Sequence, residues 1–468
     1  MADMGAGILF SPAAIAVNRF GLGARPYESP PGDPKVWLRD QLTAYQPRSR
    51  PFESLPNTAT IAASFAEQRV AAFAANDARR RQEIQAAMRR ENRQQFIAAA
   101  NARILSAVET DTPFAERLVH FWANHFAISA DKVVVVPFVG SFEIEAIRPH
   151  IVGKFEDMLF AAERHAGMTL YLDQAASVGP GSAQARAAQA RNPNNVPGLN
   201  ENLAREIMEL HTLGVRSGYT QNDVTEFARA LTGWSTAAFG RGPTPNATPG
   251  EFVFRSAFHE PGTRTVLGRR YDQAGEAQAQ AILHDLAHAP ATATHIATKL
   301  ARHFAGDTPP ASLISRLASA FTTSGGHLAA VYRVLIDSPE TWIPQPVKFK
   351  TPWDWTISAL RGTDLRSPAR SRALDMLRQL GQSVWQPGSP AGWSDNDASW
   401  AAPDALVRRV EAASQLAALV PVQYDPRELV GKLLMSPPGP ATRSAIAGAD
   451  NLMAGLVLML VSPEFQRR

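Results

Sequence analysis

Cysteine is absent from the 468 residues of this chain, and no apolar run approaches the length of a membrane span. Without cysteine the protein has no disulfides, no thiol nucleophile and no cysteine-ligated zinc or iron–sulfur centre. The longest apolar run near the C-terminus, Leu452 to Val461, is about half of the roughly 18 residues that a spanning helix needs. We therefore expect a soluble protein.

Several common functional motifs are missing as well. The sequence contains no G-x-S-x-G elbow, no Walker loop, no G-x-G-x-x-G, no H-E-x-x-H and no haem motif. Common serine hydrolases, nucleotide-binding enzymes and zincins are thus without support. Because no basic residue precedes the short apolar run at the N-terminus, we expect a cytoplasmic protein as the sequence stands, or a periplasmic one if a signal was removed.

Charged residues are also sparse, at 19% of the chain, with a net charge of +4. Arginine supplies 40 of the 47 basic residues and lysine only 7, a compositional bias that by itself does not indicate nucleic-acid binding. The one local basic excess, Arg79 to Arg103, has only Phe96 as an interleaved aromatic residue. It is typical of a solvated helix face, with an anion-binding surface as the alternative.

Helical patterning dominates what is present. Ala59 to Ser106 has almost no glycine or proline and predicts one or two long helices, and Ala274 to Asp337 predicts several more. No series of strands alternating with helices supports a doubly wound sheet. The prediction is a mostly α fold, a large irregular multi-helix bundle with long polar loops and at most a small β-hairpin, Glu251 to Val266.

Three long loops are expected between these helices. They are Ala175 to Asn200, Phe239 to Glu251 and Trp385 to Trp400. Loops of this length are usually functional or mobile. The third contains three tryptophans, which we expect to pack either on the protein itself or on a ligand. We treat 1–468 as one domain, with sub-lobes 1–236 and 252–468.

The densest charge lies in the stretch GLNENLAREIMELHTLGVRSGYTQNDVTEFARALTGW, which predicts two short helices. The first runs from about Glu201 to Leu213 and ends at Gly214. Its polar residues gather on one stripe, and its apolar residues share the other side. Within that stripe, Glu201, Arg205 and Glu209 are spaced as a charge ladder.

The second helix begins at Thr220, where Asp223 completes a capping-box-like start, and it closes at Gly233. Asp223, Glu226, Arg229 and Thr232 form another polar stripe. Two antiparallel helices would place the two stripes against one another. Such a seam is either a structural ion-pair network or a site for a cation or for a sugar-like or phosphate-like ligand, and both alternatives stay open.

Two pairs of histidines stand out among the eleven. His120 and His125 are five residues apart, which does not match the zinc spacing; we favour His125 as functional, with a satisfied core histidine as the alternative. His284 and His288 have the i, i+4 spacing. Because HDLAHAP offers no carboxylate besides Asp285, this pair alone does not define a metal site.

The charged stretch is similar to the signature of a bacterial family, named domain of unknown function 1800, and the resemblance covers nearly the whole chain. The blocks that carry it, besides the stretch itself, are VNRFGLGARP (Val17 to Pro26), FWANHF (Phe121 to Phe126), MTLYLDQAASVGPGS (Met168 to Ser182), FHEPGTRTVLG (Phe258 to Gly268), ATHIATKLARHF, VKFKTPWDW (Val347 to Trp355) and GQSVWQPGSPAGW (Gly381 to Trp393).

The resemblance implies a large helical protein and defines no activity. It also implies a partner, because members are often encoded beside the family named domain of unknown function 1501, which resembles alkaline phosphatases or sulfatases. The chain departs from the family pattern at Ala123, where FWHNHF is frequent, at Gln174, where YLDN is usual, and at Glu260, where HDPG is usual. The first departure counts against a paired-histidine metal site.

Two hypotheses of function follow. The first is a hydrolase or lyase acting on a glycan-like or anionic-sugar substrate, in which carboxylates and His125 do acid–base work and Arg205 or Arg229 binds an anion. Ca²⁺ or Mg²⁺ would suit the oxygen ligands of such a cluster. The second is a non-enzymatic helical binding or assembly protein. The candidate catalytic residues are His125, Asp173, Glu206 and Glu209, and the candidate substrate-binding residues are Asn124, Asn202, Arg205, Arg229, Trp234, His259 and Trp385.

Overall fold

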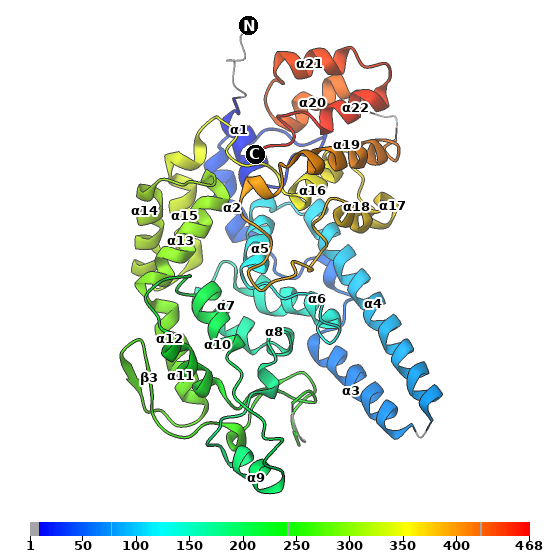
Figure 1. The fold of residues 1–468 in the computed structure, drawn as a ribbon. Coiled ribbons are helices and arrows are strands. Elements are labelled where there is room, and N and C mark those ends of the chain that lie inside the picture. Colours follow the sequence, from blue (N-terminus) through cyan, green and yellow to red (C-terminus); the bar gives the residue numbers. More distant parts are fainter. Residues whose placement is uncertain (1–8, 76, 241–243, 422–423) are drawn as a thin grey trace.

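Helices make up most of the computed structural model, which describes residues 9–75, 77–240, 244–421 and 424–468 (Figure 1). The mostly α prediction is confirmed, with two small antiparallel strand pairs besides the helices. Among the described residues, no helix combines the length and the apolar character needed to cross a membrane. The N-terminal segment 1–8, and part of the loop predicted from Phe239 to Glu251, lie outside the described residues.

The first quarter of the chain contains a projecting helical hairpin. Its two helices, α3 and α4, fall within the stretch predicted to hold one or two long helices, and they extend away from the body in Figure 1. The side chains of Asn57 and Asp77 cap their N-termini. The elements here are α1 (Pro12–Ala14), η1 (Ile15–Phe20), α2 (Pro34–Ala44), η2 (Arg50–Phe52), α3 (Thr58–Ala74), α4 (Ala78–Glu109) and α5 (Pro113–His125).

The next section is built from short helices. The predicted helix over Glu201 to Leu213 begins as an α-helix and continues as a π-helix, η7. The predicted loop from Ala175 to Asn200 contains an alanine-rich helix, α9, which Ser182 caps. The elements are η3 (Val136–Phe138), α6 (Val139–Phe142), η4 (Glu143–Ile147), η5 (Arg148–His150), α7 (Phe155–Arg164), α8 (Ala166–Tyr171), η6 (Gln174–Ala176), α9 (Ala183–Arg191), α10 (Asn202–Glu206), η7 (Ile207–His211) and α11 (Gln221–Leu231).

The strands pair differently from the single hairpin predicted between Glu251 and Val266. Strand β2 (Phe252–Phe254) pairs with β1 (Trp234–Thr236), and β3 (Arg264–Val266) pairs with β4 (Arg269–Tyr271). The turn between β3 and β4 consists of Leu267 and Gly268, both with positive φ. A two-residue loop of this kind is typical of a tight hairpin. The predicted hairpin ended at Val266 and therefore did not include β4, the strand that follows this loop. A 3-10 turn, η8 (Ser256–Phe258), lies between the pairs.

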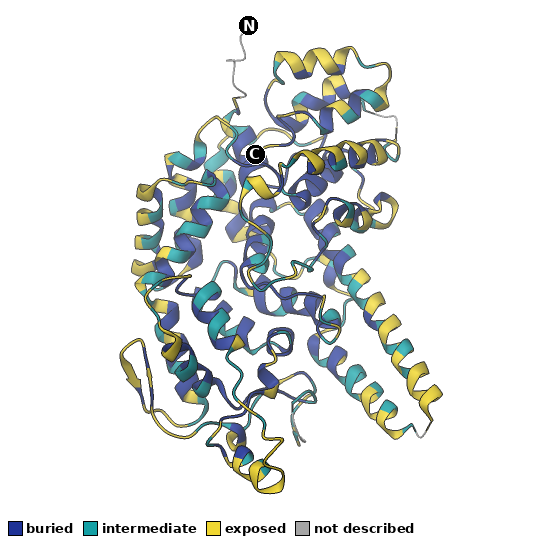
Figure 2. Ribbon diagram, viewed as in Figure 1, coloured by how far each residue is buried: buried dark blue, intermediate teal, exposed yellow. Residues whose placement is uncertain are grey.

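The second half of the chain packs helices around the same core. A continuous cluster of buried apolar side chains extends from Phe10 to Phe465. Figure 2 draws α5 and α16 largely in the dark blue of buried residues, and every residue of α16 is buried. The elements are α12 (Glu276–His288), α13 (Pro290–Ala305), α14 (Ala311–Thr323), α15 (Leu328–Asp337), η9 (Pro339–Trp342), α16 (Pro352–Gly362), α17 (Pro368–Ser371), α18 (Ala373–Gln379), η10 (Asp397–Ser399), α19 (Pro403–Ala417), α20 (Pro426–Leu434), α21 (Pro440–Ala447) and α22 (Leu452–Leu460).

Candidate functional site

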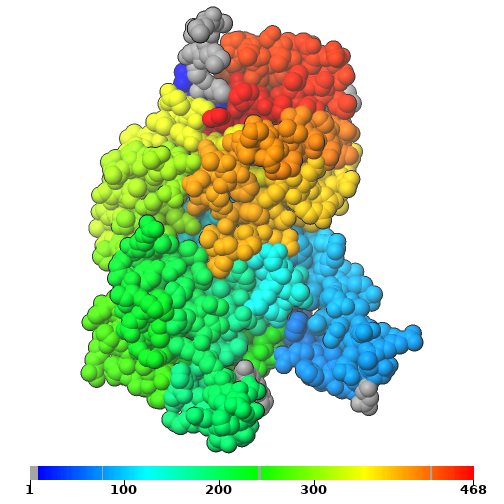
Figure 3. Space-filling model, viewed as in Figure 1, coloured from blue at the N-terminus to red at the C-terminus, as the bar shows by residue number. Residues whose placement is uncertain are grey.

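A cavity of about 110 Å³ lies between α5, the start of α16 and the loop 385–400. We call it the tryptophan-roofed cavity. In Figure 1 the loop crosses in front of α5, and in Figure 3 the orange segment covers the middle of this face. The cavity is lined by four tryptophans, five cationic side chains and three carboxylates: Trp353, Trp385, Trp393, Trp400, Arg103, Arg117, Lys299, Lys348, Arg468, Asp354, Asp395 and Asp397.

The roof loop is attached to α5 through Asn124. The Asn124 side-chain amide donates to the Trp393 carbonyl at 3.0 Å, and its Oδ1 accepts from the Trp393 backbone N–H at 2.7 Å. Gly392, with a φ of +76°, passes so close that an added Cβ would lie 2.4 Å from the Asn124 carbonyl oxygen. Only glycine allows this approach without a shift of the backbone.

The other end of the roof is held by Trp385. Its carbonyl accepts from the Ala130 N–H at 2.8 Å, and its indole N–H donates to Glu143 Oε2 at 3.1 Å. The same oxygen accepts from Arg103 Nε at 2.7 Å. The Arg103 guanidinium lies over the rings of Trp353, at 4.2 Å, and Trp385, at 5.4 Å. This cation therefore joins a wall tryptophan to a roof tryptophan.

Lys348 joins the roof to the body of the protein. Its Nζ forms ion pairs with Asp307 and Asp397 and donates to the Asp395 carbonyl at 2.7 Å. The Asp397 carboxylate also accepts from the Phe349 N–H at 2.8 Å. Since Asp395 and Asp397 both belong to the roof, a single lysine fixes this part of the loop against the segment before α16.

Asp354 forms the charged floor of the cavity. Its two carboxylate oxygens accept from Arg117 Nη1 and Arg468 Nε, each at 3.0 Å. Burial alone would raise the pKa of Asp354, but the two guanidinium groups hold that pKa well below its usual range. Burial also lowers the pKa of Arg117 to about 10. The floor is thus a buried ion triad.

Positive charge exceeds negative charge in the lining. Five cationic side chains face three carboxylates, and two histidines, His120 and His303, also line the wall. Lys299 is the most loosely paired of the cations, because its Nζ lies 3.9 Å from Asp395 Oδ2 and the lysine side chain is 15% exposed. Arg103 and Lys348 are also paired with Glu143 and Asp307, which lie outside the lining, so Lys299 is the cation most available to an anion.

Both histidines of the wall have lowered pKa values. Burial lowers the pKa of His120, and burial together with Arg468 and Arg117 lowers the pKa of His303 well below its ordinary value. The His120 Nδ1 accepts from the Trp353 indole N–H at 3.1 Å, so its basic nitrogen is occupied. The Nε2 of His303 is buried without a hydrogen-bond partner in the described part of the chain.

His125 lies one residue beyond Asn124 and belongs to a second, fully buried cluster. Its Nε2 bonds to the His211 carbonyl at 3.1 Å, and His211 Nδ1 bonds to Glu163 Oε1 at 2.7 Å. Burial, followed by the charge of Lys299, lowers the pKa of His125 well below its ordinary value. Lys299 lines the tryptophan-roofed cavity, whereas His125 does not.

The two charged stripes of the signature helices do not face one another completely. Glu201 and Arg205 of the first stripe meet Gln221 and Thr225 of α11. The second stripe faces the β3–β4 ribbon instead, where Asp223 accepts from the Leu267 N–H at 2.7 Å. The predicted face-to-face arrangement is thus only half right, because the ribbon covers the other side of α11. Glu226 of this stripe forms ion pairs with Arg229 and Arg264, and the Thr232 hydroxyl accepts from the Glu260 N–H.

Glu206 and Glu209 lie on the outer side of the signature helix. Glu209 pairs with Arg205 at 3.6 Å. Glu206 is half-buried, and within the described ranges no hydrogen bond or ion pair involves it. Burial raises the pKa of Glu206. Neither carboxylate lines the tryptophan-roofed cavity.

The other predicted site residues are dispersed. Asp173 pairs with Lys132 at 2.6 Å, and Asn202 is exposed. Trp234 is completely buried, and His259 Nδ1 bonds to the Thr232 carbonyl at 2.9 Å. Of the predicted site residues, the structure brings only Asn124 and Trp385 into the tryptophan-roofed cavity.

A sequence profile of the family described as "Protein of unknown function (DUF1800)" matches residues 15–467. The chain belongs to the DUF1800 family. This confirms the resemblance stated from the sequence over nearly the whole length. No curated protein and no solved structure matches the chain.

Four of the blocks that carry the DUF1800 resemblance converge on the tryptophan-roofed cavity. FWANHF contributes Asn124, ATHIATKLARHF contributes Lys299 and His303, and VKFKTPWDW and GQSVWQPGSPAGW contribute wall and roof. In this DUF1800 protein the four blocks are far apart in sequence, and the packing of the helices brings them together at the cavity.

Sequence reasoning missed most of the polar lining of this DUF1800 cavity. Lys299 and His303 stand four apart in a helical segment, and Lys348 and Asp354 stand in VKFKTPWDW, where lysines alternate with aromatic residues. The chain has only 7 lysines, and two of them, Lys348 and Lys350, lie in this block. That concentration could have marked the block as part of a site. Arg117 offered no such signal, because arginine is abundant throughout.

Proposed function

We propose that this protein is a hydrolase or lyase that binds a small anionic, sugar-like substrate in the tryptophan-roofed cavity. The observation that carries the proposal is the lining of the cavity, in which cations outnumber carboxylates and four indole rings surround them. Concave sites with apolar walls and a few convergent polar groups are where small ligands bind. The sequence predicted carboxylate, histidine and arginine chemistry at the signature helices; our proposal assigns the same kind of chemistry to the residues of the cavity instead.

Binding would use the cations and the aromatic walls together. Lys299 is the most loosely paired cation, so its ammonium group can turn from Asp395 to a sulfate, phosphate or carboxylate of the substrate. Trp393 and Trp400, whose ring centres are 6.0 Å apart, offer faces on which a sugar ring packs. Because Asp354, Asp395 and Asp397 each have a cationic neighbour, the proposal requires neither Ca²⁺ nor Mg²⁺.

Acid–base work falls to His303 in this proposal. Burial and the adjacent arginines lower the pKa of His303, so the ring holds a free lone pair, and protonation of the ring would draw on the negative charge of the bound substrate. His303 lines the cavity and, in the described part of the chain, neither of its ring nitrogens forms a hydrogen bond, whereas the Nδ1 of His120 accepts from the Trp353 indole N–H. We therefore assign the base to His303 and a positioning role to His120.

The test is ligand binding followed by turnover. Calorimetry with neutral, sulfated and phosphorylated monosaccharides should detect binding of the anionic sugars only, and Lys299→Met should weaken that binding by about tenfold or more. The matched control is Lys432→Met, which removes an exposed lysine of α20 outside the cavity lining. For any sugar that binds, release of its anion or cleavage of its glycoside should be lost in His303→Gln while binding is retained.

Two results would contradict the proposal. If neutral and anionic sugars bind equally, or Lys299→Met binds as the wild type does, the cavity is not an anion site. If an anionic sugar binds but no product forms, the enzymatic part fails and a binding function is left.

A second candidate function is assembly through the α3–α4 hairpin. Phe73 is 80% exposed and Val70 is 68% exposed on the projecting arm, which Figure 2 shows as largely solvent-facing near its tip. The adjoining part of α4 is rich in arginine, so the fitting partner is an acidic protein surface. The family's phosphatase-like or sulfatase-like neighbour is the partner to test. Co-migration on size exclusion that Phe73→Ser abolishes, and that the control Val215→Ser preserves, would support this function.

A further inference from the structure

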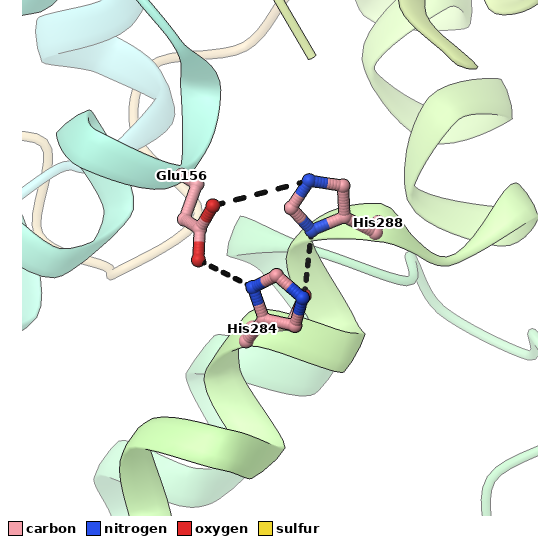
Figure 4. Close-up of side chains that lie close together, drawn as sticks. All are labelled: Glu156, His284 and His288. Atoms are coloured by element: carbon pink, nitrogen blue, oxygen red, sulfur yellow. Dashed lines mark hydrogen bonds and ion pairs between the residues drawn. The ribbon is translucent and has the colours of Figure 1, made fainter. Parts of the chain in front are cut away.

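Glu156, His284 and His288 converge on the surface between α7 and α12 (Figure 4). His284 and His288 are one helical turn apart on α12, so their side chains share a face. Glu156 comes from the first turn of α7, 128 positions earlier than His284. The sequence around the histidine pair supplies no third ligand. The packing of α7 against α12 brings Glu156 into that position.

The distances suit one metal ion. Glu156 Oε1 lies 2.7 Å from His284 Nδ1, and Glu156 Oε2 lies 3.9 Å from His288 Nε2. One ligand atom from each residue falls within 4.8 Å of the others. Around a tetrahedral zinc ion with bonds of about 2.0–2.1 Å, neighbouring ligand atoms are about 3.3 Å apart. The two Glu156–histidine distances lie on either side of that value, and the contact between Glu156 and His284 is a hydrogen bond that the ion would replace when the imidazole proton is released.

His288 already has the tautomer that a metal requires. Its Nδ1 lies 2.9 Å from the His284 carbonyl oxygen, which only accepts, so Nδ1 carries the proton. The lone pair is thus on Nε2, the nitrogen that faces Glu156. Hydrogen bonding of one imidazole nitrogen to a carbonyl is the usual way in which a metal-binding histidine is oriented.

Asp285, the carboxylate next to His284 in sequence, is not part of this group. Its Oδ2 accepts from the Tyr271 hydroxyl at 2.6 Å and pairs with Arg269. The three-residue group is also separate from the proposed substrate site, because none of its members lines the tryptophan-roofed cavity.

We propose that Glu156, His284 and His288 bind a divalent transition metal, with Zn²⁺ as the best match. Two imidazole nitrogens and one carboxylate suit Zn²⁺, whereas Ca²⁺ and Mg²⁺ prefer oxygen ligands throughout. Three protein donors leave a fourth position for water, as in catalytic zinc sites. The exposed fractions, 58% for His284 and 36% for His288, leave room for that water.

The experiment titrates chelator-treated protein with Zn²⁺ by calorimetry and with Co²⁺ by visible absorption. We expect one tight site per chain, a Co²⁺ spectrum of tetrahedral type and a rise in melting temperature with Zn²⁺. Glu156→Gln, His284→Gln and His288→Gln should each weaken Zn²⁺ binding by about tenfold or more. His327→Gln is the matched control, since His327 is an exposed histidine outside the group.

The folded state of each variant is checked by circular dichroism, and because the side chains are at the surface we expect all to fold. Absence of micromolar Zn²⁺ binding in the wild type would overturn the proposal. So would a double variant, His284→Gln with His288→Gln, that still binds one Zn²⁺ as tightly as the wild type. Loss of binding in His327→Gln equal to that in His284→Gln would show non-specific surface coordination and would also overturn it.

Discussion

The signature helices and the tryptophan-roofed cavity use charge in opposite ways. On α10 and α11 the charges are close in sequence and pair along the surface, as Glu201 does with Arg205 at 3.1 Å. In the cavity the charges are far apart in sequence and pair in the interior, as Asp354 does with Arg117 and Arg468. An exposed pair is worth little, whereas breaking a buried one leaves an uncompensated charge.

This difference shows that the density of charge along a sequence is a poor guide to a site. Local density marks helix faces, because the i, i+4 spacing repeats within one element. A cavity draws single residues from several elements, so its charges are dilute in the sequence. The contrast predicts a ranking of mutational effects between the two regions.

The largest effect is expected at the cavity floor. Asp354→Asn leaves Arg117 and Arg468 without their common partner, and should lower the free energy of unfolding by about 3–5 kcal/mol. Glu201→Gln on the signature helix is the reference, with an expected loss of about 0.5 kcal/mol or less. Urea denaturation at neutral pH measures both. If Asp354→Asn and Glu201→Gln lower the free energy of unfolding equally, the buried charges of the cavity contribute no more to stability than the exposed charges of the signature helices.

Most of the fold was accessible from the sequence, because it depends on local signals. Prolines, glycines and caps delimit the helices, and Thr220 with Asp223 forms the capping box that the sequence predicts. The strand pairs were harder. The partner of Phe252–Phe254 is Trp234–Thr236, which lies on the far side of a long loop and has no local signal.

The site was much less accessible than the fold. Asn124 and Trp385 were predicted and lie at the cavity, whereas Arg468 reaches Asp354 from the far end of the chain. A contact between residues 114 positions apart depends on the packing of whole helices. Likewise the sequence shows His284 and His288 as a pair, but not Glu156 opposite them.

The second prediction concerns acid sensitivity beside the cavity. Burial, with Lys299 nearby, lowers the pKa of His295 to about 4, from about 6.5 in the unfolded chain. The unfolded state therefore binds more protons between these values. Stability is fully present above about pH 6.5 and falls as the pH drops toward 4, by roughly 3 kcal/mol for this residue.

His295→Gln tests this expectation. Glutamine does not titrate, and its amide can still donate to the Leu210 carbonyl that His295 Nε2 contacts at 3.0 Å. Unfolding free energies measured from pH 7 to pH 4 should therefore fall less steeply in the variant. On the signature helix, hydrogen bonding from Thr225, Gln221 and Arg205 lowers the pKa of Glu201. Identical slopes in variant and wild type would assign the acid sensitivity to other groups.

The smallest expected effect concerns the roof. Gly392 and Gly388 both have positive φ, at +76° and +73°, so alanine strains the backbone similarly at either position. They differ in their surroundings: an added Cβ at 392 would lie 2.4 Å from the Asn124 carbonyl oxygen, whereas nothing lies within 4 Å at 388. Gly392→Ala should therefore cost about 1–3 kcal/mol more than Gly388→Ala.

The same pair of variants reports on the cavity, because Asn124 fixes the roof through Trp393. Displacing the loop in Gly392→Ala should expose Trp393 and shift tryptophan fluorescence to longer wavelength, whereas Gly388→Ala should leave the spectrum unchanged. If both variants have the same melting temperature and the same fluorescence spectrum, the loop accommodates the added methyl group without moving Trp393. The close packing of Gly392 against Asn124 would then not be what holds the roof over the cavity.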